Sequence, residues 1–335
     1  VLLKTASGNV TATNYTITAP IDNNWFEITK KAVVIGKNDF ASDYVWTKTY
    51  DGSEFTPASI TKTVNGEEIE ITFKPTTGKN VGQYAMEIAS FTGTDSYAVT
   101  IQENTDWLSI TAKEITVNVT KSYDGTPAFT NDKATIAGVI TEDQGKVIVS
   151  GNYPNKNVTD TAVSITDITL DGTESGNYKI VSATGTITKC AISVAVNEIE
   201  NTTKVYDGKV LTPKAVTKDV NGEKITITFK SVGPNAADNY KLTMASVSDS
   251  TNYDVTIPDV TLTISKFKYT LKDGDVSFTK VYGEDDPSLT KAFAVGSIAE
   301  TTNSALTNPD ALTLTFTRAE GKNVGSYALE TVSVN

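Results

Sequence analysis

A short motif, Lys-x-Tyr followed by an acidic-glycine turn, occurs four times in the 335 residues. Its tyrosines stand at positions 50, 123, 206 and 282, so the steps are 73, 83 and 76 residues. A period this regular predicts a series of similar domains rather than one large fold. Asp can hydrogen-bond its own backbone and Gly tolerates positive φ, so each copy predicts a tight turn after a strand. The motif residues are Tyr50, Asp51, Gly52, Tyr123, Asp124, Gly125, Tyr206, Asp207, Gly208, and, in a degenerate fourth copy, Tyr282 and Gly283.

The repeat divides the chain into four domains and a leading fragment. Residues 1–30 resemble the ends of the later units, so we expect them to be the C-terminal hairpin of a truncated preceding repeat. The last unit is expected to be truncated, because Tyr327–Asn335 aligns with Val1–Asn9. These ends fit a slice of a longer array, or a subunit that joins copies head to tail. The predicted domains are 31–112, 113–190, 191–266 and 267–335.

Alternation of β-branched residues with Thr, Asn or Lys dominates the sequence, as in Ile115–Thr120, Ile192–Val196, Ile225–Phe229 and Leu312–Phe316. This period of two predicts half-buried antiparallel strands. Asn65-Gly66 and Asn221-Gly222 are typical of type I′ hairpin turns. We therefore expect an all-β chain of small immunoglobulin-like sandwiches. A β-grasp module is the alternative, with Thr290–Ala305 as its helix; Ala134–Asp143 is the only other helix-tolerant stretch.

Six further tyrosines recur at fixed offsets, either after a Gly-Lys-Asn-Val segment or at the start of a closing hairpin. A large aromatic residue at a fixed offset indicates a core position more often than a ligand platform. We expect these tyrosines to anchor the cores: Tyr84, Tyr97, Tyr178, Tyr240, Tyr253 and Tyr327.

The predicted boundaries contain no linker. Ile110-Thr111-Ala112-Lys113 leads directly into Glu114-Ile115, and Ile187-Thr188-Lys189 leads into Cys190-Ala191. A connection without Gly, Ser or Pro restricts swivelling of one domain against the next. The sequence therefore predicts an elongated, stiff rod.

Composition limits the function. The formal charge is −11, which argues against nucleic acid as a partner, and no stretch is apolar enough for direct membrane insertion. Histidine is absent, which removes the commonest general base and metal ligand. The single cysteine, Cys190, excludes an intramolecular disulfide and is expected to be a buried thiol.

Residues 121–189 resemble the YDG domain of bacterial surface proteins. The matching residues are Tyr123-Asp124-Gly125-Thr126, Lys156-Asn157-Val158, Ile168-Thr169-Leu170, Gly176-Asn177-Tyr178 and Ile187-Thr188-Lys189. Residues 267–335 are similar to MBG-type repeats, through Val281–Pro287 and Lys322–Tyr327. The first and third units are intermediate. The resemblance implies a repetitive stalk in a large adhesin and implies no catalytic residues.

Candidate chemical sites are few. We expect no catalytic residues and no cofactor, because paired carboxylates such as Glu142-Asp143 fall in turns where charge is normally solvated. Calcium is the one metal with a weak case, since Asp273, Asp275, Glu284, Asp285 and Asp286 offer hard oxygen ligands. The lysine of each motif could form an isopeptide bond, but an exposed lysine that protects a sheet edge explains it more simply.

The leading hypothesis is therefore a non-enzymatic structural stalk that projects a binding domain from a bacterial cell, extracellular and attached to the wall or secreted. Its partners would be neighbouring repeats of the same polypeptide. One alternative is an adhesin module that binds host glycans or mucin. The other is a filament subunit that binds another copy head to tail.

Overall fold

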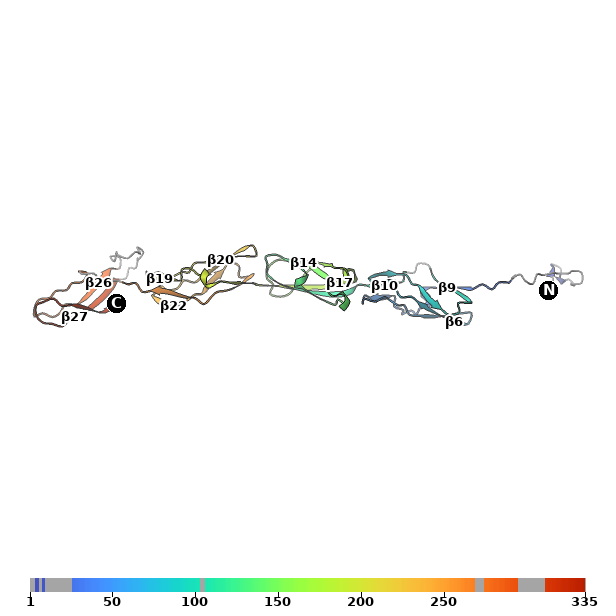
Figure 1. Ribbon diagram of the computed structural model, residues 1–335, viewed down its shortest axis with the longest axis horizontal. Coiled ribbons are helices and arrows are strands. Elements are labelled where there is room, and N and C mark those ends of the chain that lie inside the picture. The colour runs from blue at the N-terminus through green and yellow to red at the C-terminus, as the bar shows by residue number, and fades with distance from the viewer. Residues whose placement is uncertain are drawn as a thin grey trace. The chain divides into compact units, whose positions relative to one another are not determined.

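The computed structural model describes residues 4–5, 8–9, 26–102, 106–268, 274–294 and 311–334. Nearly all of its regular structure is β-strand, with a few 3-10 turns (Figure 1). The all-β prediction is confirmed. The expected helix at Thr290–Ala305 is wrong where it can be seen, because Thr290–Ala294 is strand β26; the rest of that stretch lies outside the described residues. Ala134–Asp143 begins with strand β13 and ends in the 3-10 turn η4.

Four strand sets follow one another along the chain. The first set (residues 31–111) contains three small sheets, ordered β3-β9, β5-β6-β8 and β4-β10-β7. Its strands are β3 Lys31–Ile35, β4 Thr47–Thr49, β5 Ile60–Val64, β6 Glu67–Phe73, β7 Gly82–Tyr84, β8 Ile88–Phe91, β9 Tyr97–Ile101 and β10 Leu108–Thr111.

The second set (residues 113–188) has two sheets, ordered β13-β11-β17-β15 and β12-β14-β16. Its strands are β11 Lys113–Ser122, β12 Ala128–Phe129, β13 Ala134–Ala137, β14 Ile148–Asn152, β15 Val163–Ser164, β16 Asp167–Asp171 and β17 Tyr178–Thr188. The 3-10 turns η3 Asn131–Lys133, η4 Thr141–Asp143 and η5 Ser175–Asn177 lie between them.

The third set (residues 190–265) has the sheet orders of the first: β18-β24, β20-β21-β23 and β19-β25-β22. Its strands are β18 Cys190–Ser193, β19 Thr203–Val205, β20 Val216–Val220, β21 Glu223–Phe229, β22 Ala237–Lys241, β23 Met244–Val247, β24 Tyr253–Thr256 and β25 Thr261–Ser265. The described part of the fourth set (274–294 and 311–334) is an antiparallel sheet of β26, β27 Ala311–Arg318 and β28 Leu329–Val334.

Two further 3-10 turns and one short strand pair lie within the described residues. The 3-10 turn η2 Lys37–Asp39 follows β3, and η6 Val196–Glu198 follows β18. Of the leading fragment 1–30, the structure describes the short pair β1 Lys4–Thr5 and β2 Gly8–Asn9 and residues 26–30. Most of the predicted hairpin therefore lies outside the described residues.

The strand pairing is partly parallel, which the sequence pattern did not predict. β3 pairs with β9 and β4 pairs with β10 in parallel, and β18–β24 and β19–β25 repeat both pairings. The strands β9 and β10, and likewise β24 and β25, belong to different sheets. The expected closing hairpin is therefore wrong, because each of its two strands pairs with an early strand of its own set instead.

Short-range sequence signals are confirmed at the Asn-Gly turns. Asn65 and Gly66 have φ of 55° and 85°, and Asn221 and Gly222 have φ of 55° and 76°. Positive φ at both central residues is the requirement of a type I′ turn, and it joins β5 to β6 and β20 to β21.

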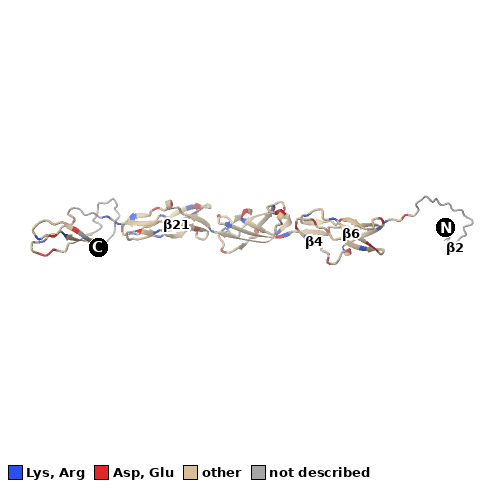
Figure 2. Cartoon of the chain, turned by 60° about the horizontal axis from the view of Figure 1, so that its bottom comes forward, with Lys and Arg blue, Asp and Glu red and all other residues tan. Residues whose placement is uncertain are grey.

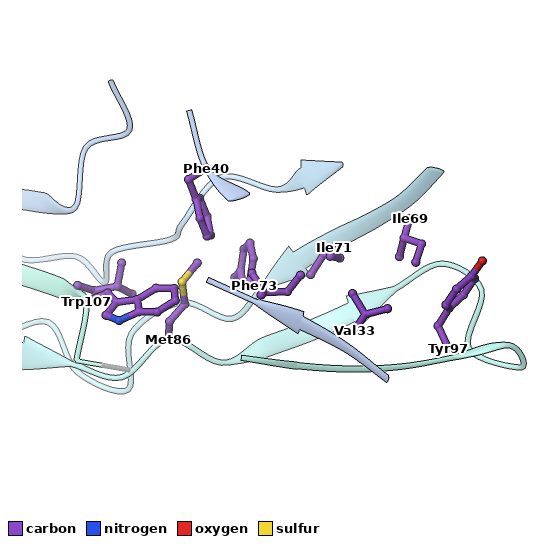
Figure 3. Close-up of a cluster of buried hydrophobic side chains, with 10 residues drawn as sticks. Val33, Phe40, Ile69, Ile71, Phe73, Met86, Tyr97 and Trp107 are labelled. Atoms are coloured by element: carbon purple, nitrogen blue, oxygen red, sulfur yellow. The ribbon is translucent and has the colours of Figure 1, made fainter. Parts of the chain in front are cut away.

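The cores form where the buried faces of strands meet. In the first set, Val33 of β3 and Ile69, Ile71 and Phe73 of β6 point into one cluster, which Trp107 extends (Figure 3). In β11, residues Ile115, Val117, Val119 and Lys121 are buried in strict alternation with exposed neighbours. Cys190 is only half-buried, so the prediction of a buried thiol is wrong.

The chain forms two compact units, and their boundary passes through the second strand set. The first unit comprises residues 1–116, 136–148 and 170–181, and the second comprises 117–135, 149–169 and 182–335. The first unit contains the junction between the first and second strand sets, and the second unit contains the junction between the second and third. Only Ala112 separates β10 from β11, and only Lys189 separates β17 from β18.

Candidate functional site: hydrogen-bonded junctions

The Tyr-Asp-Gly motif forms the turn that the sequence predicts. In the second set, the carboxylate of Asp124 accepts hydrogen bonds from the backbone N–H (3.0 Å) and hydroxyl (3.0 Å) of Thr126. Asp51 and Asp207 accept the N–H two residues on in the same way, at 2.9 and 3.0 Å. Hydrogen bonds from Lys48 and Ser53 lower the pKa of Asp51 to about 2.

The lysine of the motif holds this turn from inside. The side chain of Lys121 is 2% exposed, and its ammonium lies 2.7 Å from Asp124 Oδ1. It also donates to the carbonyl oxygens of Thr126 (2.8 Å) and Ala128 (2.7 Å). The interpretation of this residue as an exposed edge lysine is therefore wrong. Its charge is tolerated in a buried position because a carboxylate and two carbonyls replace its water.

The first junction is built on a carboxylate shared by two tyrosines. Tyr50 comes from the motif of the first set, whereas Asp143 (η4) and Tyr178 (start of β17) belong to the second. Both hydroxyls donate to Asp143 Oδ2 at 2.8 Å, and the two rings meet edge to face with centroids 5.5 Å apart. All three residues are buried, Tyr50 and Asp143 being 1% and 2% exposed. The prediction that Asp143 is a solvated turn residue is wrong.

Electrostatics keep this carboxylate ionised. Burial alone would raise the pKa of Asp143, but the hydrogen bonds from Tyr178 and Tyr50, together with the charges of Lys146 and Lys79, outweigh it and lower the pKa. Burial and the same carboxylate raise the pKa of Tyr178 to about 12 and raise that of Tyr50 further. Both hydroxyls therefore keep their protons at any physiological pH and act as permanent donors.

The second junction repeats the arrangement with a glutamate. Tyr123 of the second set donates to both oxygens of Glu223, at 3.0 and 3.1 Å, and Tyr253 of the third set donates to Oε2 at 3.0 Å. The rings again meet edge to face, with centroids 5.3 Å apart. Here Lys156 adds an ion pair at 2.7 Å to Glu223, and this contact is the main cause that lowers the pKa of the glutamate.

A buried asparagine forms a second link at each junction. Asn177 Oδ1 accepts the backbone N–H of Val81 at 2.9 Å, and its amide donates to Asn80 Oδ1 at 3.1 Å. Asn252 makes the same two contacts with Val158 (3.0 Å) and Asn157 (3.2 Å). The asparagines precede the junction tyrosines Tyr178 and Tyr253 directly. The Lys-Asn-Val loop of one set therefore fits the Asn-Tyr pair of the next.

The motif glycines lie where the neighbouring set comes closest. A Cβ on Gly125 would lie 3.1 Å from the backbone oxygen of Asn221, and one on Gly52 would lie 2.7 Å from the Cδ1 of Ile140. Both glycines also have positive φ, 81° and 83°. The positive φ of the turn therefore favours glycine at both positions, and at Gly125 the backbone of the next set also leaves little room for a side chain.

The remaining motif and anchor residues divide by burial. Tyr97, Tyr178 and Tyr253 are buried, whereas Tyr84, Tyr240 and Tyr327 are half-buried and donate to the carbonyls of Asn80, Asn235 and Asn323. Tyr206 is half-buried, and Tyr282 is 70% exposed. Asp207 pairs with Lys204, and Gly208 and Gly283 have positive φ.

The described acidic residues of the fourth set do not gather into a metal site. Asp286 pairs with Lys280 (2.7 Å) and Arg318 (2.9 Å), which neutralises its carboxylate. Asp275, Glu284 and Asp285 are described, whereas Asp273 lies outside the described residues. Over the described ranges, no group of three acidic or cysteine side chains is placed to hold a metal ion. Nor does that part of the chain contain a helix long and apolar enough to cross a membrane.

Sequence reasoning identified the tyrosines but missed their partners, the carboxylates of Asp143 and Glu223 and the side chains of Asn177 and Asn252. The sequence did contain a signal for the asparagine contacts, because the segments Lys-Asn-Val and Asn-Tyr recur together with the motif tyrosine. The arrangement has no nucleophile with an adjacent base. What it can do is hold two consecutive strand sets together.

Comparison with known proteins identifies a domain within the chain. No curated protein and no solved structure matches the chain. The YDG domain family matches residues 108–186, a range that begins with β10 and ends within β17. This stretch, which contains Tyr178 of the first junction and Tyr123 of the second, is a YDG domain.

Proposed function

We propose that the chain is part of a structural stalk of a bacterial extracellular adhesin or surface fibre, built of small immunoglobulin-like modules in series. Its work would be mechanical and not enzymatic: to hold a binding domain away from the cell. The modules would be the four strand sets, and the partners of each would be its neighbours in the same polypeptide.

The observation that carries this proposal is the repetition of one junction. At both described junctions a motif tyrosine, a carboxylate and a second tyrosine form a hydrogen-bonded trio, and an asparagine binds a Lys-Asn-Val loop beside it. A protein that needed its domains to move independently would gain nothing from buried polar links with one-residue connections. Such links suit a chain that must keep neighbouring domains in a fixed relation.

The surface composition supports the same conclusion. Acidic and basic residues are interspersed along the described strands (Figure 2), and the net charge is −11. A mixed surface with a net charge well away from zero keeps an exposed protein soluble and separate from its neighbours. It provides no basic stripe for nucleic acid.

Small-angle scattering on the chain tests the proposal. Four modules of roughly 35–40 Å in series would give a rod of about 150 Å and a radius of gyration of about 40 Å. A compact globule of this length would have a radius of gyration of about 20 Å. The larger value would support the stalk. The smaller value would overturn it, because the modules would then pack side by side.

A further inference from the structure

Parallel pairing holds the strands through which the chain enters and leaves the first set. The set begins with β3 and ends with β10. β3 pairs in parallel with β9 at five consecutive residues, and β10 pairs in parallel with β4 at three. We call these two strand pairs the terminal pairs of the set.

The third set has the same terminal pairs. It begins with β18, which pairs in parallel with β24 at four residues, and it ends with β25, which pairs in parallel with β19 at three. Among the described strand pairs of these two sets, parallel pairing joins the first two strands to the last two, and the other pairs are antiparallel. The parallel strands are therefore the ones that connect each set with the rest of the chain.

The backbone of the motif tyrosine extends the pairing of the last strand in three sets. In each of them, its N–H donates to the carbonyl of the last residue of the last strand. These bonds run from Tyr50 to Thr111 (2.9 Å), from Tyr123 to Thr188 (2.8 Å) and from Tyr206 to Ser265 (2.9 Å). In the second set β11 and β17, its first and last strands, are neighbours in one sheet, so their C-terminal ends also meet.

The direction of the terminal pairs decides how they respond to tension along the chain. Tension pulls the first strand of a set toward its N-terminal end and the last strand toward its C-terminal end. Because the paired strands are parallel, these opposite pulls slide one strand along the other, and the hydrogen bonds between them must break together. An antiparallel hairpin that is pulled at its two open ends instead loses its hydrogen bonds one at a time. The parallel pair should therefore resist the larger force.

The side chains of the terminal strands oppose the same sliding motion. Val33 and Ile35 of β3 are 4% and 0% exposed, and Leu108 and Ile110 of β10 are 0% and 1% exposed. A shift of one residue along the partner strand would move these side chains from the core face to the opposite face. Sliding therefore has to remove apolar side chains from the core as well as break backbone hydrogen bonds.

We propose that the terminal pairs are a mechanical clamp, which makes each of these sets resist unfolding by tension applied between its N- and C-terminal ends. The resistance comes from the direction of the paired strands and not from thermodynamic stability alone. This inference rests on the proposed stalk for its use: the stalk would transmit tensile force between the cell and the surface to which the binding domain attaches.

Single-molecule force spectroscopy of the full chain, pulled in two directions, is the test. Every variant carries Cys190→Ser, so that handles attach only at introduced cysteines. Lys30→Cys with Glu114→Cys applies the force at the two ends of the first set. Ser59→Cys with Lys74→Cys applies it at the open ends of the antiparallel hairpin β5–β6. All four positions are exposed, and chemical denaturation should give the two variants the same midpoint.

The two directions should give different forces in the same folded set. At one pulling rate, we expect the force at which the set first yields to be at least about twofold higher between positions 30 and 114 than between positions 59 and 74. Equal forces in the two directions would overturn the clamp, because resistance would then follow stability and not strand direction.

A matched pair of core variants tests the same point by side chain. Val33 of β3 and Ile69 of β6 lie in one core cluster, but only Val33 belongs to a terminal pair (Figure 3). Between positions 30 and 114, Val33→Ala should lower the yielding force more than Ile69→Ala does, although Ile69→Ala removes the larger buried group. Forces that rank with the loss of stability would contradict the clamp.

The clamp and the stalk can fail separately. Equal forces in the two directions together with a large radius of gyration would overturn the clamp and leave the stalk. Unequal forces together with a compact radius of gyration would overturn the stalk and leave the clamp as a property of each strand set.

Discussion

The two junctions use the same tyrosine-carboxylate-tyrosine trio in two electrostatic settings. At the first, Asp143 is 2% exposed and is held mainly by two tyrosine hydroxyls. At the second, the side chain of Glu223 is 30% exposed and adds an ion pair with Lys156. Buried polar groups depend strongly on each partner, whereas partly exposed groups can exchange a lost partner for water. The first junction should therefore be the more sensitive to single substitutions.

Removing the carboxylates gives the largest difference. Asp143→Ala leaves two buried hydroxyls without an acceptor and should weaken the first junction by about 3 kcal/mol. Glu223→Ala should cost roughly 1 kcal/mol, because Glu223 is 30% exposed and water can fill the space that its carboxylate leaves beside the tyrosine hydroxyls. The backbone N–H groups of Val81 and Val158 donate hydrogen bonds to the side chains of Asn177 and Asn252. Hydrogen exchange at these two amides therefore reports the opening of the first and the second junction.

A matched control is Asp171→Ala, which removes an exposed aspartate of the second set. It should leave both amides unchanged. Equal effects of Asp143→Ala and Glu223→Ala would show that the two settings are energetically the same, contrary to this comparison.

The second largest effect is expected when the hydroxyl of one junction tyrosine is removed. Tyr50→Phe keeps the ring contact with Tyr178 but deletes one hydrogen bond to a buried carboxylate. We therefore expect the free energy of opening, measured by exchange of the Val81 amide, to fall by about 2 kcal/mol. Tyr123→Phe should lower the free energy of opening at the Val158 amide by about 1 kcal/mol or less, because Tyr253 and Lys156 still bind the carboxylate of Glu223. Tyr44→Phe, in the core of the first set, tests whether loss of a distant hydroxyl affects either amide. A larger loss for Tyr123→Phe than for Tyr50→Phe would reverse the ranking.

These variants concern contacts that the sequence could not supply. Alternation predicted β11, β21 and β27, and the Asn-Gly pairs predicted two turns, because both signals are local. The hydrogen bond from Tyr50 to Asp143 spans 93 residues and that from Tyr123 to Glu223 spans 100, and the two acceptors sit in different local settings, a 3-10 turn and the start of a strand. An acidic residue in a turn is normally solvated, so nothing local marked Asp143 as buried.

Lys121 was missed for a similar reason. It stands in the buried register of β11, where a charged residue is uncommon, and its neighbourhood in sequence gave no sign that Asp124 and two carbonyls would surround its ammonium. The parallel pairings β3–β9 and β4–β10 could not be predicted either, because alternation specifies which face of a strand is buried but not which strand lies beside it.

Acidification should open the junctions in order. Both carboxylates have their folded pKa lowered, so each stabilises its junction above the unfolded pKa and loses that contribution as the pH falls through the folded pKa. The ordinary values are 4.5 for Glu223 and 3.8 for Asp143. In exchange measurements from about pH 6 to about pH 3, protection of Val158 should begin to fall at a higher pH than protection of Val81. Opening that sets in as the pH rises would contradict the linkage, since it would require carboxylates with raised pKa values.

The smallest expected effect separates the ion pair from the hydrogen bonds around Glu223. Lys156→Met removes the charge but keeps most of the alkyl chain beside the ring of Tyr123. A solvent-exposed ion pair contributes little and is screened by salt, so exchange at Val158 should rise by no more than about threefold at low ionic strength and should not change near 1 M salt. The first junction should not respond to the variant and should respond to salt less than the second, because Asp143 is buried and the ammonium of Lys146 lies 3.7 Å from its carboxylate. If added salt weakened both junctions equally, the exposed ion pair could not be what distinguishes them, and burial of the tyrosine hydroxyls alone would have to explain the difference between Asp143 and Glu223.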